Sequence, residues 1–186
     1  MKEASRRDLQ QAFEAIVDES HGEVILDGQA FVLIHRETIA DLQHGMEEIL
    51  GRGAETVLLR AGYRRGESLA SRLTAMVGGL ETPFVDGLRT FAARTGLCRI
   101  EAVSIEPPQV TFRVTNSFIA RGYGKATRPV CHYLRGFLLA AGEQLRRRTQ
   151  LECQERKCSA TGELECVFQV SPLPGNRDEG ARGEGA

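Results

Sequence analysis

Apolar residues recur every three to four positions in five stretches of the chain, which is the spacing of one face of an α-helix. Glycine, the residue that most often ends a helix, closes or follows most of these stretches. The predicted helices are 5–19, 37–50, 53–77, 83–96 and 130–147. Gly62 and Gly66 interrupt the third helix, so we expect its middle to be weaker than its ends.

Short apolar runs bounded by turn residues predict β-strands in other segments. The first pair of runs flanks Asp27-Gly28, a dipeptide typical of a two-residue hairpin turn. The segment 116–128 has no clear period and predicts a loop. The tail 172–186 is rich in glycine and charge, so we expect it to be disordered. The predicted strands are 24–26, 30–34, 97–106, 110–115, 150–157 and 165–170.

The order of these elements predicts an α/β fold of the α+β type, in which helices pack against an antiparallel sheet. A chain of 186 residues suits one domain with a full hydrophobic core. We place that domain at 1–171, with a mainly helical part at 1–96 and a strand–helix–hairpin part at 97–171. The tail lies outside it.

Composition and charge argue against membrane-spanning, exported and nucleic-acid-binding proteins. Apolar residues make up 41% of the chain, and no run approaches the roughly 20 apolar residues of a membrane-spanning helix. The amphipathic N-terminus lacks the apolar core of a signal peptide, so a cytoplasmic location is expected. With 24 basic and 25 acidic residues, the chain shows no electrostatic footprint for nucleic acid. Five cysteines in such a chain indicate thiols or a metal site rather than a disulfide framework.

The cysteines near the C-terminus have a spacing that favours a metal site. A turn centred on Gly162 would bring Cys158 and Cys166 together on a hairpin. A regular strand points Glu155 and Cys158 to opposite faces, so a bulge or bend is needed for both to reach one ion. Cys131 lies at a predicted helix start, where the backbone dipole favours a thiolate. Three thiolates and one carboxylate would suit structural zinc.

Several alternatives remain open on spacing alone. The cysteines could be small buried apolar residues, which is the common fate of a free thiol. Cys158 and Cys166 could instead form a disulfide, although a reducing cytosol disfavours one. Cys153 shares the strand face of Glu155 and could replace it as the fourth ligand. Cys98 has no nearby partner in the sequence and is expected in the core.

Two segments resemble the 4-vinyl reductase domain family. They are P-V-C-H-Y-L-R-G-F at 129–137 and E-R-K-C-S-A-T-G-E-L-E-C-V-F-Q-V at 155–170, and a looser likeness covers 58–70. The 58–70 segment also resembles the sensory domains of aromatic-responsive transcriptional activators, which contain the same module. The resemblance implies the ligand-binding fold of NO-signalling and Golgi-transport proteins. It also implies a zinc site that buttresses an aromatic-binding pocket, with ligands at Cys131, Glu155, Cys158 and Cys166.

The resemblance also suggests where a ligand would bind. We expect a pocket between the helix 130–147 and the sheet 97–115, covered by the segment 116–128. His132, beside Cys131, could donate a hydrogen bond to a ligand oxygen. Phenol-type sensors carry a tryptophan close to the place of Val114, and this sequence has no tryptophan, which argues against phenol specificity. The candidate lining residues are Phe112, Val114, Phe118, Tyr123, Tyr133 and Phe137.

Three functional hypotheses follow from the sequence. The first is a zinc-containing protein that binds a hydrophobic or aromatic molecule, such as a tetrapyrrole intermediate of the bacteriochlorophyll pathway. The second is an enzyme, a 4-vinyl reductase, although the sequence shows no phosphate loop, nucleophile elbow or hydride-donor fold and no catalytic residue is assigned. The third is an aromatic sensor or partner-binding subunit. A homodimer is one hypothesis for the assembly.

Overall fold

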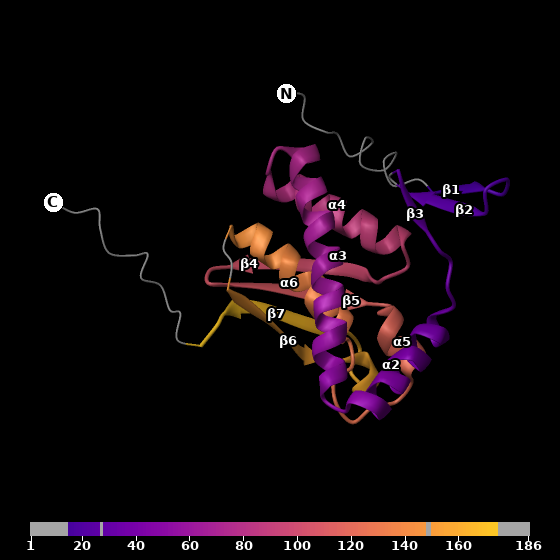
Figure 1. Ribbon diagram of the computed structural model, residues 1–186. Helices are drawn as coiled ribbons and strands as arrows, with labels where there is room; N and C mark the ends of the chain where they lie inside the picture. Colours follow the sequence, from indigo (N-terminus) through magenta and orange to yellow (C-terminus); the bar gives the residue numbers. More distant parts are fainter. Residues whose placement is uncertain (1–14, 27, 148–149, 175–186) are drawn as a thin grey trace.

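The computed structural model describes residues 15–26, 28–147 and 150–174 (Figure 1). They form an α+β fold in which helices pack against antiparallel sheets, as the sequence predicts. The predicted helix 5–19 is wrong at 15–19, where the chain forms a strand and then a turn, and residues 5–14 lie outside the described residues. The β-branched pair Ile16-Val17 favours extended backbone and pairs in register with Ile25 and Val24. A small sheet contains β1 (Ala15–Asp18), β2 (Glu23–Leu26) and β3 (Gln29–Phe31) in that order.

Three consecutive helices follow the small sheet, close to their predicted limits. They are α2 (Arg36–Leu50), α3 (Gly53–Val77) and α4 (Glu81–Arg94). Gly51 and Gly78 end the first two with positive φ angles of 54° and 64°. Residues 32–34, predicted as strand, have no regular secondary structure and carry exposed apolar side chains. No helix within the described residues is long and apolar enough to cross a bilayer.

The larger sheet has four antiparallel strands in the order β4-β5-β7-β6. Alternate residues of β5 and β7, among them Val110, Phe112 and Phe168, are fully buried. Helix α6 (His132–Arg146) packs on this face, and Figure 1 shows α3 crossing over α6 on the side away from the sheet. The strands are β4 (Arg99–Glu106), β5 (Gln109–Thr115), β6 (Leu151–Lys157) and β7 (Cys166–Pro172).

Glycines set the distance between α3 and α6. A Cβ atom at Gly62 would overlap the backbone carbonyl of Tyr133, and one at Gly136 would overlap that of Leu59. A Cβ at Gly66 would lie 2.9 Å from the Cα of Phe137. The expectation that Gly62 and Gly66 weaken the middle of the helix is therefore incomplete, because both let two helix backbones meet in the core.

The segment 116–128, predicted as a loop, contains the short helix α5 (Phe118–Tyr123). Its six residues are too few to show a helical period in the sequence. Ser117 marks its start, since its Oγ accepts a hydrogen bond from the backbone N–H of Ala120 at 3.3 Å. The tail prediction fails at Pro172, which ends β7, and residues 175–186 lie outside the described residues.

Candidate metal centre and adjoining cavity

The four predicted metal ligands converge at one end of the larger sheet. Cys131 is the residue immediately before α6, Glu155 lies near the end of β6, Cys158 directly follows that strand, and Cys166 begins β7. One ligand atom from each lies within 4.8 Å of the others, and the three cysteines are buried. The cluster therefore has the residues and proximity to hold a metal ion.

Two irregularities in the hairpin produce this convergence. The ladder between β6 and β7 changes register between Glu155 and Lys157, which is the bulge that the sequence required. The chain then turns through a 3₁₀ helix, η1 (Ser159–Thr161), and Gly162 closes it with a φ of 98°. Glu155 and Cys158 therefore face the same ion position although they are three residues apart.

The sulfur spacing fits a tetrahedral ion. Cys131 Sγ lies 3.9 Å from Cys158 Sγ and 3.9 Å from Cys166 Sγ. Sulfur atoms bound tetrahedrally to one zinc ion at about 2.3 Å would stand about 3.8 Å apart. All five cysteines are free thiols, so the alternative disulfide between Cys158 and Cys166 is not formed.

Glu155 supplies the clearest sign that the cluster suits a cation. Its Oε2 accepts a hydrogen bond from the backbone N–H of Cys131 at 2.9 Å, whereas its buried Oε1 has no partner among the described residues. Burial is the main cause that raises the pKa of this carboxyl to about 8. A cation at the cluster would satisfy Oε1 and favour the ionised form.

The thiols share their protons unevenly. The pKa of Cys166 falls to about 4, because its sulfur accepts hydrogen bonds from Cys131, Cys158 and Ser159. The pKa of Cys131 lies well above its usual value, chiefly because of its hydrogen bonds with Cys158 and Cys166. The hydrogen bonds within the cluster thus oppose the effect of the helix dipole, which on the sequence alone favours a thiolate at Cys131. A metal ion would displace these shared protons.

The other two cysteines lie outside the cluster. Burial raises the pKa of both Cys98 and Cys153 to about 12, as expected for neutral core thiols. Cys153 points into the core, and its backbone carbonyl accepts a hydrogen bond from Arg135 at 3.1 Å. Glu155, and not Cys153, joins the three clustered thiols.

Ser117 connects the metal centre to α5, a role that sequence reasoning missed. Its Oγ lies 3.2 Å from Cys131 Sγ and also caps α5. The sequence signal was present, because a serine directly before a short helical segment is a common N-cap.

We expect Ser117→Ala to lower the free energy of unfolding by about 1 kcal/mol, the usual cost of a lost N-cap. Urea denaturation measures this change. The control is Ser104→Ala, because the Ser104 hydroxyl donates only to the exposed Glu106 and its loss should cost less than about 0.5 kcal/mol. Equal stability of the two variants would contradict the capping role.

A mainly apolar cavity of about 470 Å³ lies beside α5, and we call it the α2 cavity. Its walls come from the segment 32–34, α2, α3, the turn before β4, α5 and α6. Phe118 and Tyr133 meet edge to face in it, with ring centroids 5.9 Å apart. Its lining residues are Val32, Leu33, Ile34, Arg36, Ile39, Leu42, Met46, Leu58, Thr95, Gly96, Leu97, Phe118, Ile119 and Tyr133.

Only two of the six candidate ligand residues line this cavity, namely Phe118 and Tyr133. Phe112, Val114 and Phe137 are fully buried in the core between α6 and the sheet, where the pocket was expected. Core side chains fill that interface, and the α2 cavity is lined instead mainly by α2, α5 and the segments 32–34 and 95–97. Sequence reasoning missed the wall formed by α2, because its apolar face gives the same period whether it meets a core or a cavity.

Tyr123 and His132 face a polar cluster away from the cavity. Tyr123 donates to Glu47 at 2.6 Å and stacks on His44, with ring centroids 4.1 Å apart. His132 is buried and its Nδ1 lies 4.0 Å from Glu55. Burial lowers the pKa of His132, and the residue is not part of the lining of the α2 cavity.

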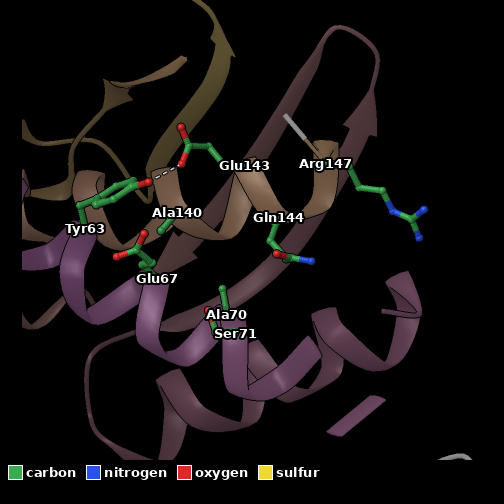
Figure 2. Close-up of a pocket in the computed structure, with 8 residues that line it drawn as sticks. All are labelled: Tyr63, Glu67, Ala70, Ser71, Ala140, Glu143, Gln144 and Arg147. Atoms are coloured by element: carbon green, nitrogen blue, oxygen red, sulfur yellow. Dashed lines mark hydrogen bonds between the residues drawn. The ribbon is translucent and has the colours of Figure 1, made fainter. Parts of the chain in front are cut away.

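A second, more open space lies between α3 and α6, and we call it the α3–α6 groove (Figure 2). Tyr63 lines this groove and donates a hydrogen bond to Glu143 at 2.7 Å. The carboxyl groups of Glu143 and Glu67 give the groove an acidic character. This hydrogen bond is the main cause that raises the pKa of Tyr63 to about 12. The side chain of Arg147 points away from the other labelled residues. The groove lacks the apolar walls of the α2 cavity.

Comparison with known proteins identifies the family. The family described as activator of aromatic catabolism matches residues 8–107, more than half of the chain. The chain belongs to this family. The 4-vinyl reductase domain matches residues 110–172, a range that includes all four clustered ligands. Both resemblances seen in the sequence are thus confirmed. No curated protein sequence matches the chain.

The solved structure of a sensory domain shows the same fold as this chain. The phenol-responsive sensory domain of the transcription activator PoxR, solved with phenol, superimposes with a TM-score of 0.75 at 21% identity, covering 92% of each chain. An H-NOX protein from S. oneidensis gives 0.49 at 16% identity, covering 90% of this chain and 88% of that one. A trafficking protein particle complex subunit 3 from Naegleria fowleri has a TM-score of 0.45 at 14% sequence identity, covering 75% of this chain and 95% of that one.

These comparisons favour the third hypothesis from the sequence over the first. The family description concerns aromatic catabolism, and nothing in the matches supports a bacteriochlorophyll-pathway protein.

Proposed function

We propose that this chain is a sensory domain that binds a small aromatic molecule in the α2 cavity, with a structural zinc ion at the neighbouring cluster. The observation that carries the proposal is a mainly apolar cavity of about 470 Å³ with two aromatic rings in its wall. Cavities of a few hundred Å³ with apolar walls and few polar groups are typical small-molecule sites. Membership in a family of activators of aromatic catabolism supports an aromatic occupant.

Zinc is the ion that best suits the donor set. Thiolates select soft or borderline ions, and three thiolates with one carboxylate leave no open position for substrate on a tetrahedral ion. The burial of all three cysteines supports a structural role. The ion would tie the start of α6 to the β6–β7 hairpin, while the protein side chains form the ligand site.

The metal centre and the cavity share their supporting elements. Cys131 stands immediately before α6, and Tyr133 follows it two residues later in the cavity wall. Ser117 contacts the Cys131 sulfur and caps α5, which carries Phe118. On the opposite wall, Gln43 of α2 donates to the carbonyl of Val130 at 3.0 Å. We infer that the ion fixes the positions of three cavity walls.

The sensor PoxR is described as phenol-responsive, so a small phenol is the natural first probe. In this chain the aromatic contacts come from Phe118 and Tyr133, because the sequence contains no tryptophan. The apolar side chains from α2 leave room for an alkyl substituent on the ring. A 4-alkylphenol therefore matches the cavity better than phenol itself.

Calorimetric titration with 4-butylphenol tests the site. We expect saturable binding with one ligand per chain, and at least about fivefold weaker binding to Phe118→Ala, because an aromatic contact contributes about 1 kcal/mol beyond its buried area. Tyr123→Ala is the matched control, since Tyr123 lies on the same helix but outside the cavity lining. Wild-type affinity in Phe118→Ala, or no binding to the wild-type chain, would contradict the proposal.

A further inference from the structure

A second cavity of about 330 Å³ adjoins the α2 cavity, and we call it the Arg65 cavity. The two share four lining residues, which are Val32, Thr95, Leu97 and Tyr133. Tyr133 therefore forms part of the boundary between them. Val32, which lines both spaces, is 85% exposed, so one ligand can extend past it from one space into the other.

The Arg65 cavity combines aromatic walls with one cationic group. The guanidinium carbon of Arg65 lies 5.3 Å from the ring centroid of Phe31 and 5.8 Å from that of Phe91. One guanidinium N–H donates to Gln29 at 3.3 Å. The rings and Gln29 thus hold the planar cation in a fixed orientation.

The charge of Arg65 is not matched by a carboxylate of the described residues. No described Asp or Glu forms an ion pair with it, and neither cavity has an acidic residue in its lining. Arg36, the other cation in the lining, is already paired with the exposed Glu37 at 3.4 Å. The joined cavities therefore present a fixed positive charge at one end, which suits an anion.

Tyr133 adds a neutral donor near the cation. Its hydroxyl has no hydrogen-bond partner within the part of the chain that the structure describes, and burial raises its pKa. Tyr133 and Arg65 line the same cavity, and the Arg65 charge lowers the pKa of Tyr133 against the larger effect of burial. A guanidinium and a hydroxyl beside aromatic rings can together bind an aryl carboxylate.

We propose that the joined cavities recognise an aromatic carboxylate, with its anionic group at Arg65 and Tyr133 and its apolar substituent in the α2 cavity. This inference rests on the proposed function, because it specifies the chemical class of the same ligand. It assigns Arg65 as the residue that gives aromatic carboxylates a higher affinity than neutral aromatic molecules.

Calorimetric titration of the wild-type chain with 4-butylbenzoate, 4-butylphenol and butylbenzene tests the assignment. We expect the benzoate to bind at least tenfold more tightly than butylbenzene. The Arg65→Gln variant should bind the benzoate at least tenfold more weakly than the wild type, and butylbenzene less than twofold more weakly. The Arg65→Lys variant should keep part of the benzoate affinity. Arg64→Gln, which removes the neighbouring cation of α3 outside both linings, should change neither affinity more than twofold.

The outcomes separate this inference from the proposed function. If the neutral probes bind saturably and the benzoate binds no more tightly, an aromatic site exists and its anion selectivity is refuted. An equal loss of all probes in Arg65→Gln would show a packing role and also refutes it. If no probe binds the wild-type chain, the proposed function itself fails. Should Arg65→Gln not fold, the wild-type preference and its decrease at high salt decide the question.

Discussion

Replacing Cys158 with alanine should remove the metal ion and most of the stability of the chain. Binding of zinc to a structural site contributes about 10–16 kcal/mol in small zinc domains, comparable with the whole stability of many proteins. We therefore expect Cys158→Ala to lose at least about 4 kcal/mol of unfolding free energy and to contain no stoichiometric zinc. Elemental analysis and urea denaturation measure the two effects.

Cys153→Ala is the matched control for this substitution. Cys153 is as buried as Cys158 and lies on the same hairpin, but its thiol stands outside the cluster. It should keep one equivalent of zinc and lose only about 1 kcal/mol. Glu155→Gln, which keeps the side-chain size, should retain the fold and bind zinc more weakly. A zinc-free Cys158→Ala that is as stable as Cys153→Ala would refute the structural role.

Adding a methyl group at Gly136 should lower the free energy of unfolding nearly as much as Cys158→Ala does, because of packing alone. The added Cβ would overlap the carbonyl oxygen of Leu59 and lie 2.7 Å from the backbone nitrogen of Tyr63. Backbone atoms of a packed helix cannot move aside as a flexible side chain can, so α3 and α6 must separate. We expect Gly136→Ala to cost about 3 kcal/mol or more in unfolding free energy, measured by urea denaturation.

Gly45→Ala provides the comparison for the helix-crossing variant. Gly45 lies in α2, and a Cβ there would meet no atom within 4 Å. The substitution should therefore stabilise the chain by about 0.5–1 kcal/mol, because alanine favours a helix over glycine. If both variants change stability by the same amount, the close crossing of α3 and α6 does not depend on glycine.

Local patterns predicted much of the fold. The helices 37–50 and 53–77 and the strands 97–106 and 110–115 differ from the observed elements by only a few residues, because each carries a clear apolar pattern along most of its length. Residues 15–18 show the limit of such patterns. Their helical spacing is outweighed by pairing with β2, a partner that only the folded chain provides.

Part of the metal cluster could be found from local spacing, whereas the full set of four ligands rested on the resemblance to the 4-vinyl reductase domain family. Glu155, Cys158 and Cys166 lie within one hairpin, and the need for a bulge follows from strand geometry. Zinc as the occupant stays a prediction, since the residues define a metal site without naming its ion.

The ligand cavity could not be predicted in the same way. Its walls come from six parts of the chain between residues 32 and 133, and an apolar side chain follows the same pattern in a core or a cavity wall. Arg65 could not be identified as a ligand residue from the sequence, because its guanidinium packs on Phe31 and Phe91, which are far away along the chain.

A native mass spectrum of the purified wild-type chain, recorded with and without 4-butylphenol, tests the central claim most directly. It reports the metal and the ligand of the same folded molecule. We predict one zinc ion per chain in both spectra and one bound 4-butylphenol when the probe is present. A folded chain that carries no metal, or one that binds no aromatic probe at saturating concentration, would contradict a zinc-supported aromatic sensor.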